Sequence, residues 1–284
     1  MTVALVSCRA NDGDPDQEIL QEALAVVGIE GCWVNWDDPT VLWDSYELAV
    51  IRSTWDYVSR REEFLAWAAT VPRLCNPYAL LVANTDKRYL GDLERRGVRI
   101  VPTRFYEVGE SVDFPTGNFV LKPSVGAGSI DAERFDAASL EAARQHALDL
   151  HAKGRCVLVQ PYIDSVDEQG ETALIYIDGE FAHAMNKAAM LNVGALDRTG
   201  LFMMEQMSRR SVARELVDLG HTVLANCGFA TPLYARVDLV QTDDGWAVME
   251  LEMTEPSLFL SFNQPTAHQL AQAVARRCAV DQPH

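Results

Sequence analysis

The sequence predicts a parallel α/β domain followed by antiparallel α+β regions. The first hundred residues alternate short apolar strands with amphipathic helices, a pattern typical of parallel strands joined by right-handed crossovers. The later residues instead contain neighbouring strands separated by tight turns, which pair antiparallel. A chain of 284 residues with 48% apolar and 23% charged residues is long enough, and balanced enough, to form more than one packed core.

The N-terminal elements follow one another at a regular spacing. Gly28, Pro72 and Gly97 each mark the end of an amphipathic stretch, as helix-stopping residues do. We therefore expect strands over residues 3–6, 31–36, 48–51 and 98–101, with helices over residues 18–27, 60–69 and 86–96.

The elements after residue 100 are expected to form two further subdomains. Pro102, Gly109, Pro115 and Gly117 cluster at the first boundary. The division that we predict is a domain over 1–100, a lid subdomain over 101–163 and a C-terminal subdomain over 164–284. Its expected elements are strands 119–122 and 155–160, hairpins 172–177/181–185 and 234–240/246–252, and helices 138–153, 210–227 and 266–278.

Charge and cysteine content exclude several classes of function. With 24 basic and 41 acidic residues, the net charge is −17, which disfavours binding to nucleic acid or to anionic membranes. No run of 18 apolar residues is present, and the N-terminus reads as a strand and not as a signal peptide. Six scattered cysteines form no zinc or redox pattern. We expect a cytoplasmic protein with reduced thiols, and we leave open whether it forms a homo-oligomer.

An acidic ribbon near the end of the chain is the most informative feature. Side chains alternate along a strand, so Arg236 shares a face with Asp238, and Glu250 shares one with Glu252. A three-residue loop over 243–245 would set Asp238 opposite Glu250 and Arg236 opposite Glu252. On the other face, Val237, Leu239, Met249, Leu251 and Met253 are expected to be core.

That register would gather three carboxylates, whereas a two-residue loop would set Asp238 against Leu251 and separate them. Facing like charges destabilise a sheet by roughly 0.2–1 kcal/mol, and a divalent cation removes this penalty. Oxygen ligands without histidine or thiolate favour Mg²⁺ or Mn²⁺. An acidic sheet face in contact with solvent is the alternative interpretation.

Two weaker motifs precede the ribbon. Lys122 ends a strand and is followed by a small flexible loop, residues 126–129, whose amides could surround phosphate oxygens. Gln160-Pro-Tyr-Ile163 ends another strand and could offer backbone groups to a purine edge. Neither motif is specific alone. The familiar P-loop, GxGxxG, HExxH and GxSxG patterns are absent.

The order of these motifs resembles the ATP-grasp superfamily over about residues 85–256. The resemblance implies an ATP-grasp architecture in which two α+β subdomains hold ATP and Mg²⁺, and in which a carboxylate is phosphorylated and then attacked by an amine. It implies ATP contacts by Lys87, Lys122, Gly126, Gly128, Ser129, Gln160, Pro161, Tyr162, Ile163 and Glu171, with Asp167 as the second candidate for the ribose. It implies metal ligands Asp238, Glu250 and Glu252, and catalytic charges from Arg236 and Lys122.

Further segments are similar to the D-cycloserine synthetase branch of that superfamily. They are Arg52-Ser-Thr-Trp-Asp-Tyr57, Asn76-Pro77, Gly170-Glu171 and residues 179–187. This similarity implies a ligase that closes a ring within one small amino-acid-like substrate, for which two groups in one molecule supply high effective molarity. Substrate contacts are then expected from Arg52, Asp56, Lys187 and Ser257, with Arg52 on a carboxylate and Asp56 on an ammonium.

Two other functions stay open at this point. One is an intermolecular ligase of the glutathione synthetase or D-alanine ligase type, and the other is a nucleotide-binding protein without catalysis. Two departures from the first type are visible, because Glu252 stands where those ligases have asparagine, and Ala173 where glutathione synthetase has arginine.

Overall fold

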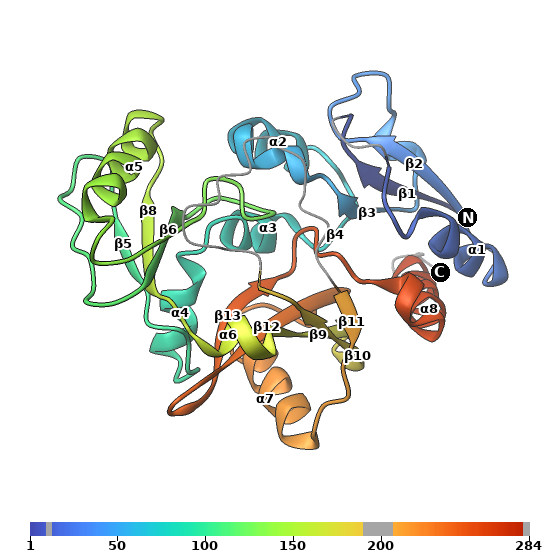
Figure 1. Cartoon of the computed structure of the whole chain (residues 1–284). Coiled ribbons are helices and arrows are strands. Elements are labelled where there is room, and N and C mark those ends of the chain that lie inside the picture. Colours follow the sequence, from blue (N-terminus) through green and yellow to red (C-terminus); the bar gives the residue numbers. More distant parts are fainter. Residues whose placement is uncertain (10–12, 190–206, 281–284) are drawn as a thin grey trace.

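The N-terminal part of the chain forms a four-stranded parallel sheet, as predicted. The computed structural model describes residues 1–9, 13–189 and 207–280, and in it the strand order is β2-β1-β3-β4 with every neighbouring pair parallel (Figure 1). The elements are β1 (Thr2–Ser7), α1 (Gln17–Val26), β2 (Glu30–Asn35), η1 (Trp43–Ser45), β3 (Leu48–Ser53), η2 (Trp55–Ser59), α2 (Arg61–Ala68), β4 (Leu74–Cys75), α3 (Tyr78–Asn84) and α4 (Tyr89–Arg95).

The middle of the chain forms a separate four-stranded antiparallel sheet in the order β5-β8-β6-β7. Phe119, Phe135, Ala147 and Leu150 belong to a buried cluster confined to this sheet and the helix that covers it. We call this unit the lid; Figure 1 shows it in green, apart from the other two sheets. Its elements are β5 (Arg104–Tyr106), β6 (Phe119–Pro123), β7 (Glu133–Phe135), α5 (Leu140–Ala152) and β8 (Val157–Pro161).

The C-terminal part forms a five-stranded antiparallel sheet in the order β11-β10-β9-β12-β13. The predicted turn between its first two strands is confirmed: Asp178 and Gly179 both have positive φ, as a two-residue hairpin turn requires. The elements are α6 (Ser165–Gln169), β9 (Glu171–Ile177), β10 (Glu180–Lys187), β11 (Met207–Arg209), α7 (Arg214–Ala225), β12 (Tyr234–Thr242), β13 (Gly245–Glu252), η3 (Leu260–Phe262) and α8 (Gln264–Val280).

The first and third sheets share their apolar cores. Alternate residues of β9 face opposite sides, so Ile175 joins a cluster with β1, α1 and α8, while Leu174 joins a second cluster with α2 and α3. The last helix, α8, packs against the first, α1, and Figure 1 shows these two helices next to each other. No helix in the described ranges is long and apolar enough to cross a bilayer.

Three predicted elements differ from those observed. The expected helix over residues 86–96 begins only at Tyr89, and the expected helix over 210–227 is shortened to α7. The expected strand over 98–101 is an extended segment with a single bridge, where Ile100 lies beside Val248. Six short strands and α-helices, β4, α3, β5, β7, α6 and β11, had no predicted counterpart, because two to seven residues carry little periodicity.

The β12–β13 register agrees with the prediction, although its cause differs. Asp238 pairs with Glu250, and Arg236 with Glu252. The loop, however, has two residues, because Thr242 pairs with Gly245, and a bulge at Met249 restores the pairing. The bulge also turns Met249 out of the predicted core: it packs beside Val101 and Val166 and lines the central cavity.

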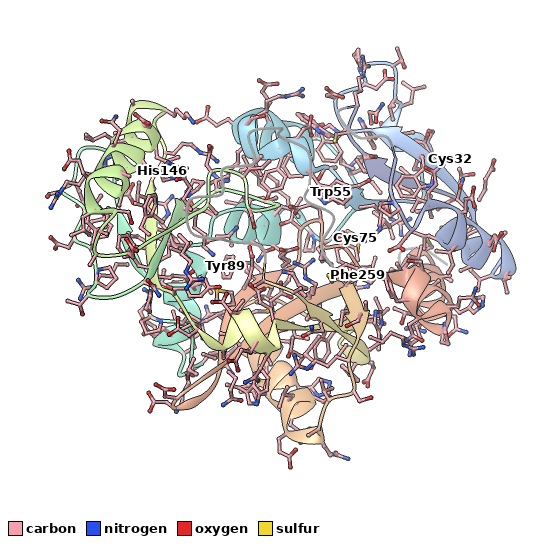
Figure 2. The ribbon with its side chains drawn as sticks, viewed as in Figure 1. Cys32, Trp55, Cys75, Tyr89, His146 and Phe259 are labelled. Atoms are coloured by element: carbon pink, nitrogen blue, oxygen red, sulfur yellow. The ribbon has the colours of Figure 1, made fainter. Side chains whose placement is uncertain are left out.

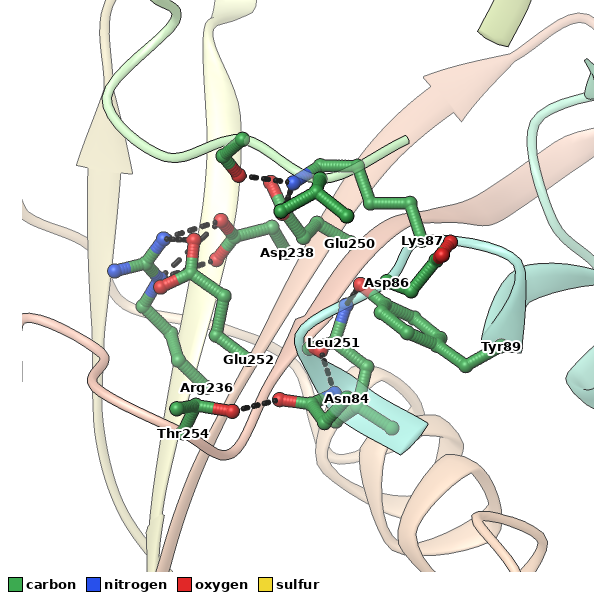
Figure 3. A network of polar contacts seen from close by, with 12 residues as sticks. Asn84, Asp86, Lys87, Tyr89, Arg236, Asp238, Glu250, Leu251, Glu252 and Thr254 are labelled. Carbon is green, nitrogen blue, oxygen red and sulfur yellow. Dashed lines mark hydrogen bonds and ion pairs between the residues drawn. The ribbon is translucent and has the colours of Figure 1, made fainter. Parts of the chain in front are cut away.

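The side chain of Asn84 fixes the end of β13 and is expected to matter for stability. Its amide donates to the carbonyl of Leu251 at 2.7 Å, and its Oδ1 accepts from the amide of Met253 at 2.7 Å and from Oγ1 of Thr254 at 3.2 Å (Figure 3). Asn84→Ala leaves these buried groups unpaired, so we expect a loss of about 3 kcal/mol in the free energy of unfolding. Urea unfolding measures it, with Asn226→Ala at an exposed helix end as the control; equal losses would contradict this role.

Candidate active site

A cavity of about 1020 Å³ lies where the three sheets meet. Three of the four lysines of this acidic chain line it, together with a cluster of carboxylates. Trp55 at the start of η2 and Phe259 from the segment after β13 also border it, and Figure 2 shows both near the centre of the molecule.

The acidic ribbon lies on one wall of this cavity. Ligand atoms of Asp238, Glu250 and Glu252 all lie within 4.8 Å of one another. Arg236 extends across them: its Nε lies 2.9 Å from Oδ1 of Asp238, and its NH2 lies 2.6 Å from Oε1 of Glu252 (Figure 3). The structure therefore brings together the four residues that the ribbon was expected to gather.

Lysines from two other elements complete this cluster. The Lys87 ammonium lies 2.8 Å from Glu250, and it donates to the carbonyl of Gly126 in the lid at 2.5 Å. The Lys187 ammonium lies 2.9 Å from Asp238 and 3.2 Å from Glu171. If either lysine turned to a phosphate oxygen, Glu250 or Asp238 would lose a cationic partner, and a divalent cation in the carboxylate cluster would replace it.

Lys122 lines the cavity on β6, and in the described residues no hydrogen bond or ion pair engages its ammonium. Burial lowers the pKa of Lys122, and the nearby Glu250 carboxylate raises it only in part. A cation in this position is suited to an anionic ligand.

The donor set fits a hard divalent cation. All three clustered ligands are carboxylates, and the cluster contains no histidine or cysteine. Asp238 is fully buried, and its pKa is lowered to about 2 by Arg236 and Lys187 despite that burial. Glu252 shows the opposite effect, because burial and the charges of Glu250 and Asp238 raise its pKa to about 7. Positive charge added at this place would relieve that repulsion.

The expected nucleotide residues border the same cavity. Gly128 and Ser129 adopt left-handed backbone conformations in the lid loop, an uncommon conformation for a residue with a side chain such as Ser129. All ten residues expected to contact ATP line the cavity: Lys87, Lys122, Gly126, Gly128, Ser129, Gln160, Pro161, Tyr162, Ile163 and Glu171. Met249, which was expected in the core, lines it as well.

Asp167, the second candidate for the ribose, lies apart from the cavity lining. It pairs with Arg134 at 3.0 Å and accepts a hydrogen bond from the Tyr162 hydroxyl. The guanidinium of Arg134 also lies 3.4 Å from the centre of the Tyr162 ring. Asp167 is thus engaged by Arg134 and Tyr162, whereas Glu171 lines the cavity.

The substrate residues expected from the first sheet are only partly brought together. Arg52 is buried and lines the cavity. Ser257 lines the cavity too, whereas Asp56 does not. Asp56 instead accepts a hydrogen bond from the Trp36 indole at 2.9 Å and pairs with Arg60 at 3.7 Å. The chain turns into η2 after β3, and this turn carries Asp56 away from Arg52.

The acid that faces Arg52 is Asp14, which the sequence did not single out. Its Oδ2 lies 3.6 Å from NH2 of Arg52, which is longer than a hydrogen bond. Both side chains are almost fully buried, and neither Nε of Arg52 nor Oδ2 of Asp14 has a hydrogen-bond partner in the described residues. Buried charges left incompletely satisfied beside a cavity suit a ligand that carries both charges.

Glu255 is a second functional candidate that sequence reasoning missed. It lines the cavity next to Glu252, and it is only 6% exposed. Burial and the charges of Glu252 and Glu250 raise its pKa to about 8. The sequence feature that could have indicated Glu255 is its position as a third acidic residue, three positions after Glu252.

This shift has a consequence for stability. A carboxyl whose pKa is raised in the folded state contributes stability that is complete below its ordinary value near 4.5 and is lost as pH rises through about 8. Between pH 6.5 and 8.5 the ligand-free protein should therefore lose about 2 kcal/mol of unfolding free energy through Glu255. Urea unfolding at several pH values measures it; a Glu255→Gln variant with the same slope would contradict it.

Comparisons with known proteins agree with this fold. A family model described as the N-terminal domain of D-cycloserine synthetase DcsG matches residues 3–76. The cycloserine biosynthesis protein DcsG of Streptomyces lavendulae is 38% identical over 93% of this chain and 94% of its own length. A crystal structure of D-cycloserine synthetase DcsG superposes with a TM-score of 0.89 at 35% identity, covering 98% of this chain and 100% of that one.

A more distant likeness shows the fold alone. The D-alanine–D-alanine ligase of Bacillus anthracis in complex with ATP has a TM-score of 0.65 at 14% identity, over 98% of this chain and 97% of that one. The fold and its cavity define an ATP-grasp ligase. Within this class, the chain belongs to the D-cycloserine synthetase family.

Proposed function

We propose that the enzyme uses Mg-ATP to phosphorylate the carboxylate of a small amino-acid derivative and then closes a ring within that molecule, as in the formation of D-cycloserine from O-ureido-D-serine. The observation that carries this proposal is the single cavity that joins the acidic cluster, three lysines and the Arg52–Asp14 pair. The similarity to DcsG over nearly the whole chain supports the same substrate class.

The nucleotide would lie between the lid and the third sheet. Its base would contact Pro161–Ile163 and the apolar side chain of Met249, and its ribose would face Glu171. Lys87 and Lys122 would neutralise the phosphates, and the amides of residues 126–129 would surround the terminal phosphate. Asp238, Glu250 and Glu252 would hold Mg²⁺, which when bound neutralises phosphate charge that these acids would otherwise repel.

Phosphoryl transfer to a carboxylate brings two anions together, and positively charged side chains in the cavity would reduce their repulsion. Arg236 and Lys122 place positive charge on two sides of the cavity, where the transition state spreads negative charge. Arg52 and Asp14 would hold the opposite charges of an amino-acid head group, and Lys187 and Ser257, which line the same cavity, would contact the rest of the substrate. A cavity that encloses the acyl phosphate also excludes water that would hydrolyse it.

Product analysis by mass tests the proposal. The purified protein is incubated with Mg-ATP and O-ureido-D-serine, and ADP and the product are measured. Formation of D-cycloserine with stoichiometric ADP supports it. Dipeptide formation from two added amino acids would favour an intermolecular ligase, and ATP binding without ADP release on any substrate would favour a non-catalytic nucleotide-binding protein.

A further inference from the structure

Glu255 is a buried carboxyl of the cavity that neither the nucleotide nor the proposed metal site uses. Glu255 follows the acidic ribbon and lines the wall between that ribbon and the first sheet. Its backbone carbonyl accepts a hydrogen bond from the Trp55 indole at 3.2 Å. The carbonyl of the next residue, Pro256, lies 3.4 Å from NH1 of Arg52. Glu255 therefore stands between the proposed phosphoryl site and the proposed head-group site.

The carboxyl of Glu255 is oriented by Tyr57, whose hydroxyl hydrogen-bonds to it. Tyr57 is 4% exposed and lies in η2, so the phenol is held in place by packing. A carboxylate has two oxygens, and one phenol hydrogen bond leaves capacity to accept another hydrogen from a ligand in the cavity.

The surrounding cations are engaged by other acids. Lys87 pairs with Glu250, and Arg236 pairs with Asp238 and Glu252, while no ion pair within 4.0 Å involves Glu255 in the described parts of the chain. The charged groups that act on it are Glu252, Glu250 and Lys87, of which the two acids favour its protonated form. A buried carboxyl without a cation costs stability, and such groups occur where a proton is exchanged.

We infer that Glu255 is a catalytic residue that accepts the proton of the attacking nitrogen during ring closure, and that Tyr57 is the residue that positions it. The inference rests on the proposed function. The nitrogen lone pair forms the new C–N bond at the acyl carbon, and the C–O bond to phosphate breaks, with the electron pair leaving on phosphate. The nitrogen proton passes to the Glu255 carboxylate and from there to water. With O-ureido-D-serine the new ring nitrogen still carries the carbamoyl group after this step, and one water then hydrolyses that N–C bond, releasing carbon dioxide and ammonia and leaving D-cycloserine. Removing this proton prevents the nitrogen from leaving again in place of phosphate.

Glu255→Gln separates the two half-reactions. The variant should still release about one equivalent of ADP in a rapid burst with Mg-ATP and O-ureido-D-serine, and hydroxylamine should trap its acyl phosphate as a hydroxamate. Ring formation should fall by about 10²–10⁴-fold. Glu63→Gln, whose side chain is 69% exposed on the first domain, is the control and should match the wild type.

The other outcomes would overturn the inference. Ring formation by Glu255→Gln within a few-fold of wild type would exclude the proton-transfer role, and loss of the ADP burst would assign Glu255 to the first half-reaction instead. A wild-type protein that releases no ADP with this substrate would overturn the proposed function itself, and this inference with it.

Tyr57→Phe provides a second readout that a purely structural role would not produce. The Tyr57 hydrogen bond lowers the pKa of Glu255, so its loss should move the rising limb of the kcat/KM–pH profile to higher pH. Glu255→Gln should lack that limb, and Glu255→Asp should restore it in part. An unchanged limb in Tyr57→Phe, with the variant folded by circular dichroism, would contradict the positioning role.

Discussion

Glu250→Gln is expected to reduce ATP-dependent product formation by at least about 1000-fold, because one change removes a charge from two interactions. Glu250 belongs to the carboxylate cluster, and it also holds the Lys87 ammonium at 2.8 Å. Glutamine preserves the size of the side chain, so the cavity keeps its shape while the affinity for a divalent cation falls. ADP release and product formation across a range of Mg²⁺ concentrations measure the effect.

The matched control is Glu215→Gln, at an exposed position in the first turn of α7 and remote in sequence from the ribbon. It removes the same charge from a protein that already carries a net charge of −17, so a general electrostatic effect would appear in both variants. Near-normal turnover by Glu250→Gln at saturating Mg²⁺ would exclude Glu250 as a ligand.

Lys122→Ala is expected to weaken ATP binding by about 100-fold, since a charged hydrogen bond to phosphate contributes about 1.5–3 kcal/mol. The ammonium lines the cavity and has no hydrogen-bond or ion-pair partner among the described residues, so its interaction free energy is available to a ligand. Burial lowers the pKa of Lys122 in the free protein, and a bound phosphate would raise it again. Calorimetric titration with a non-hydrolysable ATP analogue at two pH values measures both effects.

Lys153→Ala is the control for this measurement. Lys153 is the one lysine outside the cavity, its side chain is 57% exposed, and it pairs only loosely with Asp131 at 3.6 Å. We expect its ATP affinity to equal that of the wild type. The same affinity in Lys122→Ala would remove Lys122 from the nucleotide site.

Local patterns were enough to predict the sheets but not all of their details. The β12–β13 pairing could be predicted because Arg236, Asp238, Glu250 and Glu252 alternate with apolar residues, and this alternation determines which faces meet. The bulge at Met249 could not be predicted, because a shorter loop combined with a bulge gives the same pairing as a longer loop. Very short strands such as β4 form only because neighbouring strands are already in place.

In the cavity, too, local patterns predict some residues, while others depend on how distant segments pack. Residues within a motif were predictable, since the spacing along one strand places them together. The partner of Arg52 was not, because Asp14 comes from a loop in another crossover, and only the packed sheet brings the two within 3.6 Å. Glu255 was missed for a related reason: its unusual environment arises from Tyr57, almost two hundred residues earlier in the chain.

The packing of α8 on α1 bears on which parts of the molecule unfold together. The first and third sheets share two buried clusters, so they are expected to unfold together, whereas the lid has a cluster of its own and contributes Leu158 of β8 to one of the shared ones. Native-state hydrogen exchange should accordingly resolve two cooperative units instead of three. Amides of β6 and β8 would exchange at a lower opening free energy than those of β1 and β9. The lid could then open while the first and third sheets stay folded.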